Sequence, residues 1–159
     1  MSILIAYASK YGCTEQCAEK LAQKFDEKVD LYNLKSAKPI DVAQYEKVIV
    51  GSSVYVGRVN KEATEFCTNN LEALKNKKIG LFICGSQEGE PLKQELAAAY
   101  PPELQSKAAI LECFGGAYTF SKMSFMEKTI VKVIAKTNKD TSTIQEDKIN
   151  SFAQALKNA

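Results

Sequence analysis

Histidine and tryptophan are absent from this sequence, and no apolar run approaches the roughly 20 residues that a membrane-spanning helix needs. Without histidine, the chain lacks the usual general base and the commonest metal and haem ligand. This absence excludes the Ser/His/Asp and Cys/His hydrolases and most transition-metal enzymes. Any difficult chemistry therefore needs a bound organic cofactor.

Cysteine is present, but its pattern argues against both a disulfide framework and a zinc site. The cysteines are odd in number and scattered, and no two form a C-x-x-C pair. They are Cys13, Cys17, Cys67, Cys84 and Cys113. We therefore expect no bound metal. Cys13, at the start of an expected helix, is a candidate for oxidation or simply a small loop residue, and the other four are predicted to be buried small hydrophobic residues.

Strong charge of one sign is also missing. The formal net charge is +2 and the pI is about 8.2, too mild for a nucleic-acid-binding protein, so we expect no nucleic-acid partner. A length of 159 residues suits a single domain over residues 1–159. The opening segment Met1–Ser9 is too short and too quickly polar for a secretion signal, so we expect a cytoplasmic protein.

Short apolar runs bounded by turn residues predict strands buried on both faces. They are Ile3–Ala8, Val29–Leu34, Lys47–Ser52, Lys78–Cys84 and Ala108–Phe114. Segments with helical spacing lie between these runs. They are residues 17–25, 63–74, a short piece at 41–45, and 90–99. Strands that alternate with helices imply an α/β fold, with parallel strands, right-handed crossovers and helices on both faces of the sheet.

Two further helices are expected near the end of the chain. Ser142 and Gln145 match a capping box, so the last helix should start near Ser142, with a buried stripe formed by Ile149, Phe152, Ala153 and Leu156. Before it, Ser121–Thr137 is predicted to be an extra amphipathic helix, with lysines opposite its apolar face. This segment is either a surface helix or a basic helix that contacts a membrane or a partner.

The segment between the first strand and the first helix has the features of a phosphate-binding loop. A helix N-terminus offers unpaired backbone N–H groups and the favourable end of the helix dipole. Ser9 and Thr14 add hydroxyl donors, Gly12 lets the backbone approach closely, and Lys10 adds charge or reaches into solvent. The loop is neither a P-loop nor a dinucleotide-binding fingerprint.

This segment resembles the flavodoxin signature, a hydrophobic pair and an aromatic residue followed by x-[ST]-x-x-[AG]-x-T-x-x-x-A. The matching residues are Ile5, Tyr7, Ser9, Gly12, Thr14 and Ala18. Ala6 stands where a larger apolar residue is usual, a difference behind the loop that leaves the phosphate contacts intact. The resemblance implies a flavodoxin-like three-layer sandwich, a parallel five-stranded sheet in the order 2-1-3-4-5, and flavin mononucleotide (FMN) as cofactor.

In a sheet of that order, the ligand lies outside the carboxyl ends of the strands, at the switch between the first and third. The segments after the third and fourth strands, Ser52–Arg58 and Cys84–Gly89, stand at that place. The resemblance implies that they flank the isoalloxazine ring, with Tyr55 or a neighbour packed against it, whereas the alternative for Tyr55 is an ordinary surface tyrosine. The expected cofactor-binding residues are Ser9, Lys10, Tyr11, Gly12, Cys13, Thr14, Ser52, Ser53, Val54, Tyr55, Val56, Gly57, Cys84, Gly85, Ser86, Gln87 and Gly89.

Two features of these segments bear on the redox properties of a bound flavin. Glu88 and Glu90 are candidates for negative charge near the ring, and such charge would disfavour the anionic reduced form of the flavin. The alternative is that both side chains are solvated. Gly57 or Gly89 is a candidate hinge for a backbone that reorients near the ring.

The residues after the last strand resemble a particular branch of the family. Gly115–Tyr118 followed by Phe125–Ile134 looks like the flavodoxin-domain branch that includes menaquinone-dependent protoporphyrinogen dehydrogenase. This resemblance implies an FMN-dependent oxidoreductase whose partners are a reductase, a quinone or another redox protein. In that branch the connection after the fourth strand is rich in Arg and Lys, whereas residues 87–107 hold four glutamates and two lysines.

Two alternatives stay open at this point. One is a soluble flavodoxin-type electron carrier without a substrate of its own, although such carriers are strongly acidic and this chain has a net charge of +2. The other is a regulatory receiver module, which would need clustered acidic residues at the strand ends that the sequence does not have.

Overall fold

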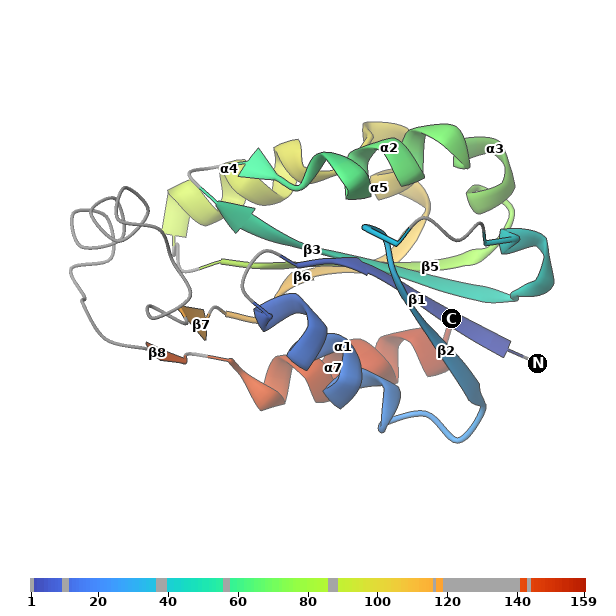
Figure 1. Ribbon diagram of the computed structural model, residues 1–159, viewed down its shortest axis with the longest axis horizontal. Coiled ribbons are helices and arrows are strands. Elements are labelled where there is room, and N and C mark those ends of the chain that lie inside the picture. The colour runs from blue at the N-terminus through green and yellow to red at the C-terminus, as the bar shows by residue number, and fades with distance from the viewer. Residues whose placement is uncertain are drawn as a thin grey trace.

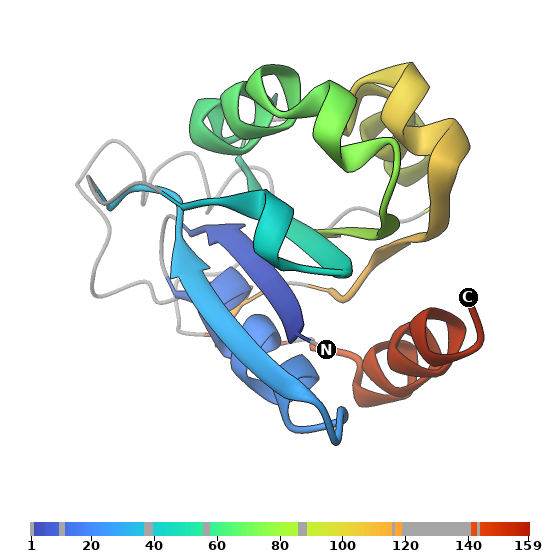
Figure 2. The ribbon, with the colours of Figure 1, turned by 90° about the vertical axis from the view of Figure 1, so that its right-hand side faces the viewer.

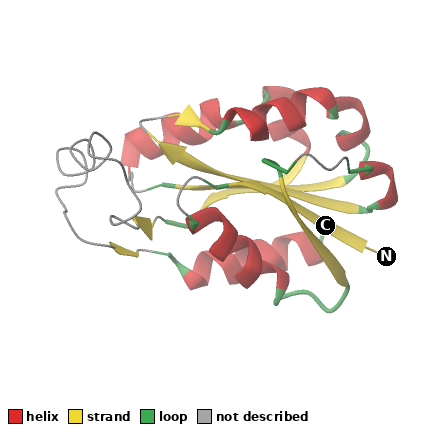
Figure 3. Ribbon diagram, in the orientation of Figure 1, coloured by secondary structure: helices red, strands yellow, loops and turns green. Residues whose placement is uncertain are grey.

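The computed structural model describes residues 2–9, 12–36, 40–55, 58–85, 89–115, 117–118, 141–142 and 144–159. Its strands are β1 (Ser2–Ala8), β2 (Lys28–Asn33), β3 (Lys47–Tyr55), β4 (Arg58–Val59), β5 (Lys78–Cys84), β6 (Ala108–Cys113), β7 (Ala117–Tyr118) and β8 (Thr141–Ser142). Its helices are α1 (Cys13–Ala22), the 3-10 helix η1 (Val42–Gln44), α2 (Lys61–Asn69), α3 (Leu71–Leu74), α4 (Gly89–Ala99), α5 (Pro102–Lys107) and α7 (Glu146–Lys157). Strands and helices alternate along most of the chain, as Figure 3 shows.

The five long strands form one parallel sheet in the order β2-β1-β3-β5-β6. Numbered along the chain, this is the predicted order 2-1-3-4-5, which confirms that expectation. The register places Ile5 of β1 opposite Leu31 on one side and Ile49 on the other. The order reverses beside β1, so the carboxyl ends of β1 and β3 lie next to each other at the switch point.

Helices cover both faces of the sheet and form two separate cores (Figures 1 and 2). α1 and α7 lie on one face, and α2, α3, α4 and α5 lie on the other. The predicted stripe of α7 is fully buried and packs with the inward face of α1. The three-layer arrangement follows from apolar strands that need cover on both sides.

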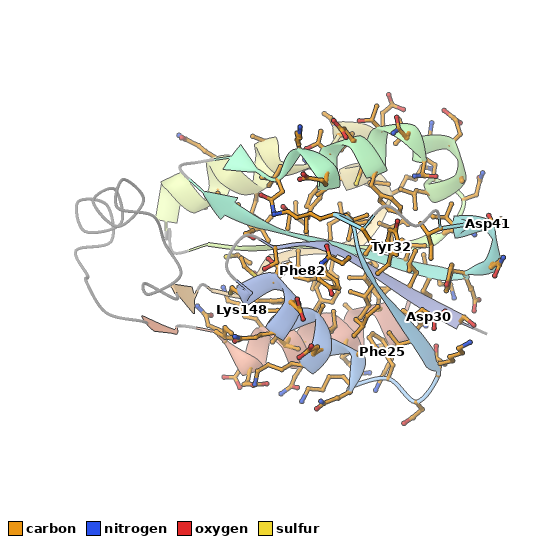
Figure 4. The ribbon with its side chains drawn as sticks, in the orientation of Figure 1. Phe25, Asp30, Tyr32, Asp41, Phe82 and Lys148 are labelled. Atoms are coloured by element: carbon orange, nitrogen blue, oxygen red, sulfur yellow. The ribbon has the colours of Figure 1, made fainter. Side chains whose placement is uncertain are left out.

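Phe82 of β5 lies at the centre of the core beneath α1 and α7 (Figure 4). Its ring stacks on Phe114 with centroids 4.7 Å apart, and it meets Phe152 edge-on at 6.0 Å. All three rings are fully buried. Gly51, directly opposite Phe82 in the register, leaves the space that this ring fills, because a Cβ there would lie 2.0 Å from Cζ of Phe82.

Three predictions about the elements are wrong. β2 and β6 are not buried on both faces, because they are the two edge strands of the sheet: Leu31 of β2 is 43% exposed, and in β6 only Cys113 is buried. β3 does not end at Ser52 but runs on to Tyr55, because its end pairs with β4 in an antiparallel hairpin. The last helix begins at Glu146 rather than near Ser142, since Ser142 belongs to β8, and no capping box forms.

The structure bears on two further expectations about the chain. Of the helices in the described ranges, none combines the length and the apolar character needed to cross a bilayer. The predicted amphipathic helix Ser121–Thr137 lies outside the described residues. The short α5 lies beyond the helix predicted at residues 90–99, and it starts at Pro102 because proline is well tolerated in the first turn of a helix.

Candidate functional site

The carboxyl ends of β1, β3 and β5 meet at one edge of the sheet, beside the start of α1. The register aligns Ala8 with Ser52, and Ser53 with Cys84, so the ends of these three strands lie side by side. This edge lies on the left in Figure 1, where the arrowheads of the strands point. Most of the residues predicted to bind a cofactor come together here.

The loop before α1 is held in a conformation that leaves the helix N-terminus open. Gly12 has a φ of +92°, in the left-handed region that favours glycine, and its N–H donates to Oγ of Ser9 at 2.8 Å. The carbonyl of Gly12 accepts the N–H of Gln16 at 3.0 Å, so the helix starts directly after it. Gly12, the residue before α1, has no side chain that could cap the helix, and a helix N-terminus of this kind is suited to binding an anion.

Lys35 adds a positive charge to this loop, and sequence reasoning missed it. Its Nζ donates to the backbone carbonyl of Ser9 at 2.8 Å, although the residue is exposed to solvent. Lys35 lies just after β2, where the N–H of Leu34 still bonds to the carbonyl of Tyr7 on β1. The predicted strand order could have identified Lys35, because when the first and second strands pair in parallel, the residues that follow them lie close together.

Thr14 is placed differently from the expectation that its hydroxyl faces a phosphate. The residue is fully buried, and its Oγ1 donates to Oγ of Ser53 on β3 at 3.1 Å. The hydroxyl of Ser53 lies 3.4 Å from the carbonyl of Ala8, to which it donates. Thr14 and Ser53 therefore join the first turn of α1 to both strands beneath it and fix the width of the site.

Ser52 and Asn60 form the side of the site near α2. Oγ of Ser52 accepts the backbone N–H of Asn60 at 3.0 Å and donates to the carbonyl of Ser53. The amide Nδ2 of Asn60 is buried and is the one such side-chain atom in the described chain without a hydrogen-bond partner. A buried donor without an acceptor costs free energy unless a ligand satisfies it. Sequence reasoning missed Asn60, because it lies beyond the predicted loop and matches no motif.

The end of β5 completes the edge. Cys84 is the last residue of the strand rather than a loop residue, and the N–H of Gly85 donates to the carbonyl of Gly115 at 2.8 Å. Val54 is half-buried, and a Cβ on Gly85 would make only an ordinary contact of 3.5 Å with it. Gly85 and Val54, both among the residues predicted to bind the cofactor, therefore lie next to each other across β3 and β5.

Several predicted site residues cannot be placed. Lys10, Tyr11, Val56, Gly57, Ser86, Gln87 and Glu88 lie outside the described residues. For Tyr55, Gly89 and Glu90, the backbone is described but the side-chain environment is not. Stacking of Tyr55 on a ring and a hinge at Gly57 or Gly89 therefore stay predictions.

A group of cysteines lies beneath the first turn of α1. All five cysteines of the chain are buried thiols, as expected for four of them. The Sγ atoms of Cys17 and Cys84 are 3.5 Å apart. A hydrogen bond with Cys13 raises the pKa of Cys17, and hydrogen bonds with Cys13 and Cys17, followed by burial, raise the pKa of Cys84.

Comparison with solved structures gives the same fold. The chain is similar to two-electron reduced flavodoxin from Megasphaera elsdenii, with 18% identity, a TM-score of 0.62 and coverage of 99% of both chains. It is also similar to oxidised flavodoxin 1 from Bacillus cereus, with 12% identity, a TM-score of 0.60 and coverage of 99% of this chain and 98% of that one. A third is the FMN-bound flavodoxin from Fusobacterium nucleatum, with 14% identity, a TM-score of 0.54 and coverage of 99% and 97%.

No curated protein matches the chain. Its sequence does match the family described as "Flavodoxin domain" over residues 4–145, which include the open loop at Gly12 and the strand ends that form the site. On that match, which spans most of its length, the chain belongs to the flavodoxin domain family.

Proposed function

We propose that this chain binds FMN at the carboxyl edge of its sheet and carries electrons between redox partners. The observation that carries the proposal is the loop around Gly12: a left-handed turn, an uncapped helix N-terminus and the ammonium group of Lys35 on the carbonyl of Ser9. A phosphate monoester suits this arrangement, because it needs several donors and positive charge at one point. The FMN-bound flavodoxin from Fusobacterium nucleatum supports the choice of cofactor.

The unpartnered amide of Asn60 is a second observation in favour of a flavin. An isoalloxazine ring presents carbonyl and ring-nitrogen acceptors, and a buried N–H donor beside Ser52 is a group that such an acceptor would satisfy. A purely phosphate-binding site would leave this donor unexplained, since Asn60 belongs to the side of the edge formed by β3 rather than to the loop before α1.

The side chains and backbone of this chain bind the cofactor and hold it in a fixed orientation. Ser9 and Gly12 keep the loop open, Lys35 supplies charge, and the bond between Thr14 and Ser53 holds α1 at a fixed position over β3. FMN supplies the reversible uptake of electrons. With no histidine in the sequence, proton and electron chemistry depends on that cofactor.

Ser9→Ala tests the phosphate loop, and riboflavin, which lacks the phosphate, is the internal comparison. The substitution removes the acceptor that holds Gly12 in place, so we expect FMN affinity to fall by about 1–3 kcal/mol and riboflavin affinity to stay unchanged. Titration followed by the quenching of flavin fluorescence measures the affinity for FMN and the affinity for riboflavin. Ser106→Ala is the matched control, because it also removes one hydroxyl hydrogen bond, to the carbonyl of Glu103, far from the site on α5.

Two results would contradict the proposal. Unchanged FMN affinity in Ser9→Ala would mean that the loop does not bind the phosphate. An equal loss for FMN and riboflavin would mean that Ser9 supports the fold of the site rather than the phosphate contact.

A finer hypothesis is that the chain also oxidises a substrate of its own, as the protoporphyrinogen dehydrogenase branch does. The net charge of +2 and the basic segment Ser121–Thr137 favour it, since both depart from an acidic electron carrier. Parallel assays separate the two functions: protoporphyrinogen oxidation with a quinone acceptor, and cytochrome reduction driven by a flavodoxin reductase. Turnover in the second assay alone supports the carrier, and quinone-linked turnover supports the enzyme.

A further inference from the structure

Three thiols from two elements converge beneath the first turn of α1. Cys13 and Cys17 are four residues apart on α1 and therefore share one face of the helix, and Cys84 is the last residue of β5. Their Sγ atoms all lie within 4.8 Å of one another. Their exposed fractions are 5%, 0% and 3%, so the cluster is shielded from solvent.

The spacing of the sulfur atoms matches a three-coordinate metal thiolate. A metal–sulfur bond of about 2.3 Å, the length seen for zinc thiolates, places the corners of a planar triangle of sulfurs about 4 Å apart. The distance of 3.5 Å between Cys17 and Cys84 and the 4.8 Å limit for the whole group bracket that value. Small rotations about the Cα–Cβ bonds would bring the three sulfurs onto one ion.

The kind of metal follows from the donor set. Sulfur donors select soft ions such as Cu(I), whereas structural zinc sites are closed by four ligands. In the described part of the chain, the cluster consists of these three thiols alone, and burial keeps a water ligand from completing a tetrahedron. Cu(I) is satisfied by three sulfurs and needs neither a fourth ligand nor water.

We propose that Cys13, Cys17 and Cys84 form a binding site for one Cu(I) ion. Binding forms three copper–sulfur bonds, the thiol protons leave to the solvent buffer, and copper stays in the +1 state, so no oxidant or reductant is consumed. The N-terminal end of α1, where Cys13 is the first helical residue, favours the negative charge that the thiolates bring.

The same cluster is poorly suited to act as an oxidative switch. Reactive thiols have a lowered pKa, whereas a hydrogen bond with Cys13 and burial raise the pKa of Cys17, and hydrogen bonds with Cys13 and Cys17 together with burial raise the pKa of Cys84. A soft metal ion overcomes that preference, because coordination removes the proton from the thiol directly.

Competition for Cu(I) tests the proposal on the full chain. The protein, kept reduced with a phosphine under anaerobic conditions, is titrated against a Cu(I) complex of a coloured chelator. We expect wild type to withdraw one equivalent of copper, Cys17→Ala to bind at least tenfold more weakly, and Cys67→Ala to equal wild type. Cys67 is the matched control, because it is also fully buried but lies in the opposite core, on α2.

A second variant and a direct measurement keep the test decisive. Cys84→Ala removes a ligand from β5 instead of α1 and should cause the same loss. Should either variant fail to fold by circular dichroism, X-ray absorption of copper-loaded wild type decides the matter, with three sulfur neighbours at about 2.3 Å supporting the site. Failure of wild type to withdraw copper, an equal loss in Cys67→Ala, or nitrogen and oxygen neighbours around the metal would overturn it.

Discussion

Gly51→Ala should destabilise the chain through a clash that can be read from the structure. The new Cβ would lie 2.0 Å from Cζ of Phe82 and 2.4 and 2.5 Å from its two Cε atoms. Carbon atoms in contact normally lie about 3.5–4.0 Å apart, so the ring or the strand must move by about 1.5 Å. The ring has little room to move, because Phe114 stacks on it and Phe152 meets it edge-on.

The magnitude follows from the cost of overpacking a closed core, about 1–3 kcal/mol, and this clash belongs at the upper end. For a chain of this size, each 1 kcal/mol lowers Tm by about 2–4 °C, so we expect a decrease of several degrees and up to about 12 °C. Thermal unfolding followed by circular dichroism or calorimetry measures it. Gly85→Ala is the matched control, since its Cβ would make an ordinary contact of 3.5 Å with Val54.

A double-mutant cycle identifies the clash as the cause. Phe82→Leu replaces the ring with a shorter side chain that lacks the Cε and Cζ atoms, so Gly51→Ala should cost clearly less in that background, with a coupling of about 0.5–3 kcal/mol. A Tm for Gly51→Ala within about 1 °C of wild type, or an equal cost with and without the ring of Phe82, would refute the reasoning.

Two further predictions concern the site and the response to pH. Lys35→Gln should weaken FMN binding by up to about 1 kcal/mol, with a difference that shrinks as salt is added, because the ammonium group is exposed. Fluorescence titration checks this, and an equal loss in the control Lys28→Gln, at the other end of β2, would contradict it. Burial and the hydrogen bond that Tyr45 donates to Asp30 raise the pKa of Tyr45 to about 12; Figure 4 labels Asp30. The contribution of this group to stability is therefore complete below pH 10 and lost as the pH rises through 12. Tyr45→Phe should therefore unfold at lower urea at pH 7 and lose less stability than wild type between pH 10 and 12; parallel curves for the two proteins would contradict this.

The alternation of apolar runs and helical spacing was sufficient to predict the five long strands and their order along the chain, but not α5 or the short strands β4, β7 and β8. Runs such as Lys78–Cys84 are strands with the predicted bounds, because a strand covered on both faces must be apolar throughout. The stripe of the last helix was equally readable, since Phe152 and its neighbours recur at helical intervals and all are buried. Ser9, Gly12 and Thr14 were predicted to contact a phosphate because one local segment, a turn entering a helix, contains them all, whereas the hydroxyl of Thr14 donates to Ser53 on β3.

The tertiary structure decided whatever depends on segments distant in the sequence. Lys35 contacts Ser9 only because β2 pairs with β1, and β3 extends past Ser52 only because β4 pairs with its end. The spacing of the cysteines in the sequence shows no C-x-x-C pair. Only the packing of α1 on the sheet places the Sγ atoms of Cys17 and Cys84 3.5 Å apart. Periodicity reports which face of an element is buried, whereas the partners of that face are set by how the layers pack.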